Sequence, residues 1–234
     1  MKSWEVFEAK TRGTGELPYK FDLSVSVLTQ AHWPTYPQVE LILPKDMEAA
    51  AETFKVFYQG RNSGRRLYWQ HSLGSNTVTA EMGKAGQKEF HVSTPQAVVL
   101  LLFNSLAPGQ SLSYKGILAQ TGMEATELKR TLQSLACGQI PTRVLRKSPQ
   151  GKDVNEEDTF IVNENLKNDR ARIRINQIQE RQTVREVALG KDLRACEADF
   201  LHTFFFARWK NRKRRSSTCS SKESSFCRLP LCAL

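Results

Sequence analysis

Histidine and cysteine are the side chains that most often carry catalysis or hold metal ions. The chain has four histidines, His32, His71, His91 and His202. They lie far apart, without a cysteine or acidic residue at the spacing of a metal site or a catalytic triad. The five cysteines also lack metal-ligand spacing, and three of them lie in the last sixteen residues. We therefore predict reduced thiols, no metal or other cofactor and no catalytic site.

Basic residues are the second group of interest, because they can bind nucleic acids or acidic partners. The net charge is +10, but residues 191–234 hold ten Lys or Arg against four Asp or Glu, so most of the excess lies in the tail. The basic cluster at 210–215 is either a nuclear-import signal or solvated, and we expect the protein in nucleus and cytoplasm. Loop 58–66 has glycines and arginines but lacks the Gly-Lys-Ser/Thr ending of a phosphate loop. We interpret it as a turn that is solvated or meets an acidic partner.

Residues 122–179 carry the pattern of a winged helix. Leu128, Leu132 and Leu135 fall on one face of a predicted helix at i, i+4 and i+7. Two extended runs, 143–147 and 158–162, flank a turn-rich segment as the strands of a wing would. Two helices are predicted before this unit, at 95–103 with a cap at Thr94 and at 114–120 with a cap at Ser113.

A sheet is predicted ahead of these helices. Residues 21–28 alternate between apolar and polar, and further strands are predicted at 67–72, 77–82 and 88–92. A helix at 45–59, ended by Gly60 in a left-handed conformation, is expected to cover this sheet. The alternation at 172–178 predicts a strand that returns to a sheet. Gly13 and Gly15 are expected to prevent a helix at the start, so we interpret residues 1–18 as a leader.

A winged helix raises the question of DNA binding. The predicted helix and wing carry six basic residues: Lys129, Arg130, Arg143, Arg146, Lys147 and Lys152. Six carboxylates interleave with them: Glu124, Glu127, Asp153, Glu156, Glu157 and Asp158. Acidic groups weaken a surface that tracks phosphates, so the sequence disfavours a DNA partner.

Many short runs, in the same order along the chain, resemble the cullin homology region. In the first half of the chain the runs lie at residues 27–29, 33–36, 54–55, 57–58, 60, 63–67, 69–70 and 73–74. In the second half they lie at 128–138 (LKRTLQSLACG), 151–153, 160–161 and 173–179 (IRINQIQ). The resemblance covers about residues 17–187, and its detail is closest to the fourth animal cullin paralogue. Cullins are scaffolds of multi-subunit ubiquitin ligases.

This resemblance implies a non-catalytic scaffold of an E3 ubiquitin ligase complex, which acts in ubiquitin-dependent protein degradation. A RING-box protein is expected to complete the sheet by adding a strand, and through it a ubiquitin-conjugating enzyme is recruited. In such β-augmentation, an open strand edge supplies main-chain hydrogen bonds while alternate apolar side chains supply contact. The implied RING-protein-binding residues are Leu23, Val25, Val27, Leu28, Trp33, Leu67 and Trp69.

The resemblance does not extend to the ends of a full cullin. The N-terminal arm that binds a substrate adaptor and the final domain with its modifier-accepting lysine have no counterpart. We therefore expect a cullin truncated at both ends, without an adaptor. A non-functional or competing truncated cullin is the first alternative, and a winged-helix DNA-binding protein is the second.

These inferences predict an α+β fold in four parts. They are an atypical leader at 1–16, a cullin α/β sheet domain at 17–92, a winged-helix domain with a returning strand at 93–187, and a basic, Ser-rich tail at 188–234 that is expected to be disordered. No window approaches the roughly 18 to 20 uncharged apolar residues of a membrane-spanning helix, so a soluble intracellular protein is expected.

Overall fold

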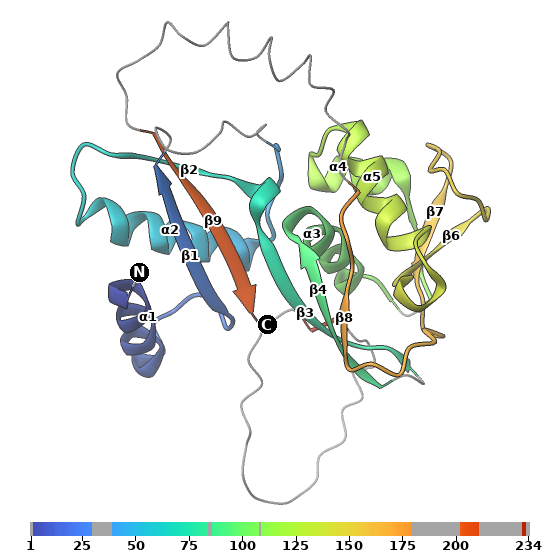
Figure 1. The fold of residues 1–234 in the computed structure, drawn as a ribbon, viewed down its shortest axis with the longest axis horizontal. Helices are drawn as coiled ribbons and strands as arrows, with labels where there is room; N and C mark the ends of the chain where they lie inside the picture. The colour runs from blue at the N-terminus through green and yellow to red at the C-terminus, as the bar shows by residue number, and fades with distance from the viewer. Residues whose placement is uncertain are drawn as a thin grey trace, which may run out of the picture.

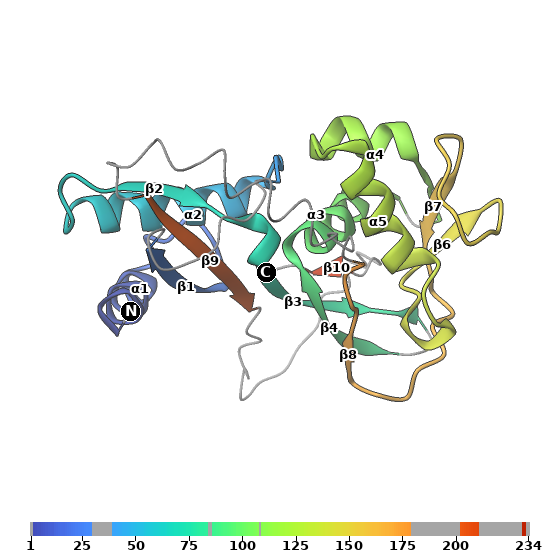
Figure 2. The ribbon, with the colours of Figure 1, turned by 45° about the horizontal axis from the view of Figure 1, so that its top comes forward.

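The structure is a computed structural model that describes residues 2–29, 39–83, 86–107, 109–178, 202–210 and 231–232. Two sheets and several helices form a mixed α+β fold, as predicted (Figures 1 and 2). Within the described residues, the larger sheet has seven strands with the path β1-β9-β3-β4-β8, while β2 pairs with β9 and β10 with β3. The second sheet has three strands in the order β5-β7-β6.

Strand β1 (Asp22–Thr29) and helix α2 (Lys45–Gln59) form as predicted. The apolar face of α2 packs on β1, and their core includes Met47, Phe54, Leu23 and Val25, all at most 5% exposed. Gly60 was predicted to end α2 in a left-handed conformation, and this prediction is wrong. Its φ of −62° is right-handed because its N–H still bonds to a carbonyl of the last helical turn.

The first residues form helix α1 (Lys2–Thr14), so the interpretation of this segment as a leader without a helix is wrong. A glycine inside a helix costs about 1 kcal/mol relative to alanine, which burial of one large side chain outweighs. Trp4 is 2% exposed and packs edge-on against Phe54 and Phe57 of α2. Tertiary packing therefore overrides the local signal of Gly13 in this helix.

The other predicted strands of the large sheet are present, with shifted ends. They are β2 (Arg66–Trp69), β3 (Ser75–Glu81) and β4 (Gln87–Ser93). A 3₁₀ turn, η2 (His71–Leu73), separates β2 from β3, which shortens the first of these strands. Strands β3 and β4 pair antiparallel, and β8 (Arg172–Arg174) pairs parallel with β4. The prediction that the Ile173 strand returns to the sheet is confirmed, but the strand ends at Arg174 and not at residue 178.

The second part of the chain supplies helices α3 (Thr94–Leu102), α4 (Tyr114–Thr121) and α5 (Ala125–Ala136). Its short strands are β5 (Leu112–Ser113), β6 (Leu145–Ser148) and β7 (Thr159–Val162), and two 3₁₀ turns are η4 (Phe103–Ser105) and η5 (Ile140–Thr142). Ser113 caps α4 as predicted, whereas Ser93, not Thr94, is the N-cap residue of α3. The order of helices and strands is the predicted one, and the winged-helix assignment stays an interpretation of that order.

Two hydrophobic clusters form the core. One joins α1, β1 and α2, and the other joins β3, β4 and β8 to helices α3–α5 and the small sheet. Leu128, Leu132 and Leu135 of α5 are fully buried in the second cluster. Helix α3 links the clusters, because Val98 lies in the first and Val99 in the second. The domain boundary at residue 92 stays a prediction, and β3 and β4 share their core with the helices that follow it.

Two strands come from the C-terminal tail, β9 (His202–Lys210) and β10 (Leu231–Cys232). The expectation of a disordered tail is therefore wrong for these residues, while the rest of 188–234 lies outside the described residues. Four of the nine residues of β9 are aromatic, a residue type enriched in strands. Figure 1 shows β9 lying beside β1, and both views place it inside the sheet. In the described part of the chain, no helix is long and apolar enough to cross a membrane.

Candidate strand-binding site

The candidate site is a position for one strand inside the large sheet, which we call the strand seat. Its walls are β1 on one side and β2 with residues 75–77 of β3 on the other. Strand β9 fills it, antiparallel to β1 and parallel to β2 and β3. Adjacent strands lie roughly 4.8 Å apart, so walls that share one neighbour stand about 10 Å from each other. The seat therefore has the width of a single strand.

Six of the seven residues predicted to bind a partner line the two walls of the seat. Leu23 and Val25 on β1 are buried, while Val27, Leu28, Leu67 and Trp69 are half-buried on β1 and β2. The structure thus brings together two segments that are about 40 residues apart in the sequence. Trp33 lies outside the described residues. The role of all seven in binding a partner remains a prediction.

The side chains of β1 alternate between the core and the surface. Leu23 and Val25 pack with α2, and Ser24 and Ser26 are exposed. Successive residues of a strand also direct their N–H and C=O groups to opposite edges. Once the main-chain groups of one residue are known to face one edge, it follows which residues of β1 can form hydrogen bonds with a strand in the seat.

Helix α1 covers the other edge of β1. The Leu23 N–H donates to Glu8 Oε1 over 3.1 Å, and Trp4 Nε1–H donates to the Leu23 carbonyl over 2.9 Å. Because the backbone of Leu23 faces α1, the N–H and C=O groups of Ser24 and Ser26 face the strand seat. A helix that covers one edge of a sheet protects it from further strands, so β1 offers its hydrogen bonds to a strand in the seat.

A partly buried polar cluster holds α1 on the start of β1. Arg12 forms ion pairs with Glu8 and Asp22 and donates to the Phe21 carbonyl over 2.6 Å. Burial raises the pKa of Glu8, although the Leu23 N–H and Arg12 oppose this shift. Burial and the nearby Glu8 raise the pKa of Tyr19, whose hydroxyl donates to Glu8. This cluster was not predicted from the sequence, although Glu8 and Arg12 have the i, i+4 spacing of a helical ion pair.

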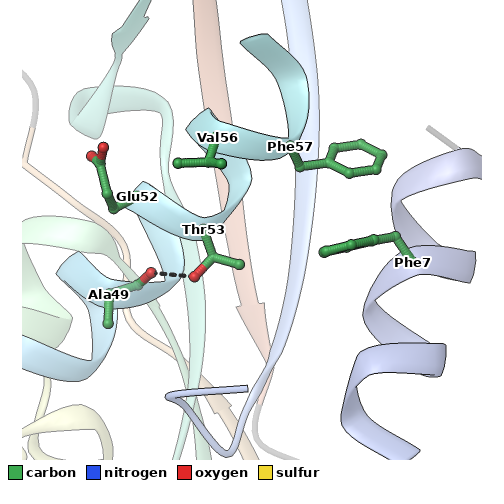
Figure 3. Close-up of a pocket in the computed structure, with 6 residues that line it drawn as sticks. All are labelled: Phe7, Ala49, Glu52, Thr53, Val56 and Phe57. Atoms are coloured by element: carbon green, nitrogen blue, oxygen red, sulfur yellow. Dashed lines mark hydrogen bonds between the residues drawn. The ribbon is translucent and has the colours of Figure 1, made fainter. Parts of the chain in front are cut away.

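A shallow groove lies between α1 and α2 (Figure 3). Its lining is mostly apolar, and the rings of Phe7 and Phe57 face each other with centroids 4.8 Å apart. The Thr53 hydroxyl in the groove donates to the Ala49 carbonyl of its own helix over 2.7 Å. Among the residues that the structure describes, no group of three or more His, Cys, Asp or Glu is placed to hold a metal. Glu52 is the one titratable side chain among the described residues that line the groove.

The surface considered for DNA is poorly suited to phosphates. Lys147 is buried in an ion pair with Asp158 at 2.8 Å, with side chains 5% and 1% exposed. Arg130 pairs with Glu127 at 3.6 Å. A recognition helix must present a free face to the major groove, but only the first two residues of α5 are exposed. These contacts support the sequence-based inference against a DNA partner.

The family of the chain follows from comparison with known proteins. A family model described as the cullin alpha+beta domain matches residues 27–166, which is more than half of the chain. The chain belongs to this cullin family. It is 49% identical to Cullin-4A of Mus musculus over 169 residues, and 50% identical to Cullin-4A of Homo sapiens over 165 residues. These matches cover 72% and 70% of this chain and agree with the predicted resemblance to the fourth paralogue.

The chain is also similar to a plant cullin. Cullin-3A of Arabidopsis thaliana is 44% identical over 142 residues, or 61% of this chain. The chain spans about a fifth of the length of these curated relatives. Residues 27–166 include β2, β3 and the end of β1, whereas β9 lies outside them. The walls of the strand seat thus overlap the family domain, and its present occupant does not.

Proposed function

We propose that this chain is a non-catalytic cullin scaffold that binds a RING-box protein by taking up one of its strands in the strand seat. Through that partner the chain holds a ubiquitin-conjugating enzyme in a ubiquitin ligase. The observation that carries the proposal is the seat itself, a position one strand wide whose walls overlap the family domain. Its occupant in the structure is a segment from outside that domain.

The chemistry of the seat suits strand addition. Main-chain groups of Ser24 and Ser26 face the seat and are matched by any strand of the right direction, so they supply affinity without sequence specificity. The buried side chains beside them, Leu23 and Val25, supply an apolar surface on the α2 side. Because β9 runs antiparallel to β1, we expect the partner strand to run antiparallel to β1 as well.

A variant of Ser26 tests this proposal on the full chain. Proline has no N–H, so Ser26→Pro removes one main-chain donor to the seat while leaving the buried face of β1 unchanged. Ser26→Ala is the matched control, since it keeps the N–H. Val25 is a poorer choice for mutation because its side chain is only 3% exposed and a charge there unfolds the core.

The measurement is the affinity of each variant for purified RING-box protein by isothermal titration calorimetry. Both substitutions are made in a chain that also carries Phe205→Pro and Phe206→Pro, so that β9 does not compete for the same donor. In this chain we expect Ser26→Ala to leave the affinity unchanged and Ser26→Pro to weaken it at least about tenfold, which corresponds to about 1.4 kcal/mol. Circular dichroism of both variants monitors the fold. If the proline and alanine variants bind RING-box protein with equal affinity, the proposal is wrong. It is also wrong if the wild-type chain binds no RING-box protein.

A further inference from the structure

The occupant of the strand seat is part of the same chain. All eight residues of β1 are in register with β9, from Asp22 opposite Lys210 to Thr29 opposite Thr203. On the other side, the four residues of β2 pair with 202–205, and residues 75–77 pair with 208–210. Strand β9 is therefore paired along both of its edges, in the manner of a central strand.

In the described part of the chain, no strand pairing joins β1 directly to β2 or β3, and β9 pairs with all three. The strand pairings that the structure describes for β1 and for β2 are all with β9. When β9 leaves, each wall presents a row of main-chain groups, and such open edges draw in another strand. A seat of this kind is filled either by β9 or by an incoming strand, because its width admits one at a time.

We infer that residues 202–210 are an intramolecular competitor of the partner strand, so that the RING-box protein binds only when β9 leaves the seat. This inference rests on the proposed function. Its basis is the position of β9, which holds the place assigned to the partner although it lies outside the matched family domain. The tail thereby closes the binding site of the domain that carries it.

The strength of this competition depends on the fraction of molecules in which β9 has left the strand seat. An apparent dissociation constant rises by the reciprocal of that fraction, so a seat that is 90% occupied by β9 weakens partner binding about tenfold. A strand on the same chain also has an advantage over a free partner, because tethering gives effective concentrations of about millimolar for short linkers. The sequence of β9, HTFFFARWK, is rich in strand-favouring aromatic residues.

A disulfide lock tests the inference in the full chain. Ser26 and Phe206 are directly opposite in the register, and opposite residues in antiparallel strands have Cα atoms about 4.5 to 5.5 Å apart, within the range that a disulfide bridges. The variant therefore combines Ser26→Cys with Phe206→Cys. Its control combines Ser26→Cys with Ser217→Cys, which places the second cysteine in the tail but outside β9.

We expect mass spectrometry to find the 26–206 disulfide in the oxidised lock variant. The oxidised form is expected to bind purified RING-box protein at least about tenfold more weakly than its own reduced form, with no such difference for the control. A second variant, Phe205→Pro with Phe206→Pro, removes one main-chain donor toward each wall and is expected to bind about tenfold more tightly than the wild type.

Three outcomes separate the failure of this inference from that of the proposed function. If the oxidised lock variant forms the disulfide and binds RING-box protein as tightly as its reduced form, competition is overturned while the scaffold function stands. If the 26–206 disulfide does not form, the place of β9 is overturned. If no form of the chain binds RING-box protein, the proposed function fails and competition fails with it, and the disulfide still reports whether β9 occupies the seat.

Discussion

Trp4 is the residue whose loss tests whether α1 covers the outer edge of β1, the edge that faces away from the strand seat. Its side chain is 2% exposed, and its ring lies 4.9 Å from that of Phe54 and 5.2 Å from that of Phe57. Truncation of a buried tryptophan to alanine costs about 3 to 5 kcal/mol. Trp4→Ala also removes the donor to the Leu23 carbonyl, which raises the cost toward the upper end of this range.

Urea unfolding of the full chain measures this loss. With a slope of about 2 kcal/mol per molar urea, a cost of about 4 kcal/mol lowers the midpoint by about 2 M. Trp4→Phe retains most of the ring packing and loses the hydrogen bond, so we expect an intermediate cost of about 1 to 3 kcal/mol. The order of the two variants therefore separates ring packing from the bond to β1.

Val6→Ala is the matched control on the same helix, because Val6 is 68% exposed. A surface substitution of this kind changes stability by no more than about 0.5 kcal/mol. If Trp4→Ala costs no more than Val6→Ala, then α1 does not pack on α2 and β1, and the cover over the outer edge of β1 is refuted.

Two further predictions concern buried charges. Lys147→Met leaves Asp158 buried without its cation and is expected to cost about 3 to 5 kcal/mol in urea unfolding. Burial raises the pKa of Glu8 above its ordinary value of 4.5, so the folded state holds this proton more tightly than the unfolded state does. The stability of the wild type relative to Glu8→Gln should therefore fall as the pH rises above about 4.5, measured by urea unfolding from pH 4 to pH 8.

Each of these has a control on the same element or loop. Lys152→Met removes an exposed lysine from the loop between β6 and β7, and a cost equal to that of Lys147→Met would contradict the buried ion pair. Glu5→Gln removes an exposed carboxylate from α1. A stability difference between wild type and Glu8→Gln that rises with pH would contradict the assigned cause of the shift at Glu8.

The spacing of apolar residues was sufficient to predict those helices and strands that bury one regular face. Helix α2 has the predicted bounds, and the three leucines of α5 lie in the core as their spacing indicates. Strand β1 was predicted from its alternation. These features depend on local patterns that a sequence displays directly. The seven expected binding residues came instead from the family resemblance, and six of them lie on β1 and β2.

Elements that depend on distant partners were missed. Helix α1 contains Gly13 and gains its stability from Trp4, whose contacts come from α2 and β1. Strand β9 has a strand-favouring composition, but its neighbours lie about 130 to 190 residues earlier in the chain. Local propensity is too weak to reveal such pairings, because tertiary context decides them.

The central claim is that a RING-box strand enters the strand seat next to β1. A photo-crosslinking amino acid in place of exposed Ser26 tests it most directly, because this residue lies opposite Phe206 in the free chain. Without partner, we expect crosslinks to residues 202–210. With purified RING-box protein, we expect them to move to one extended segment of that protein. A bound RING-box protein that leaves the crosslinks on 202–210 would contradict the account.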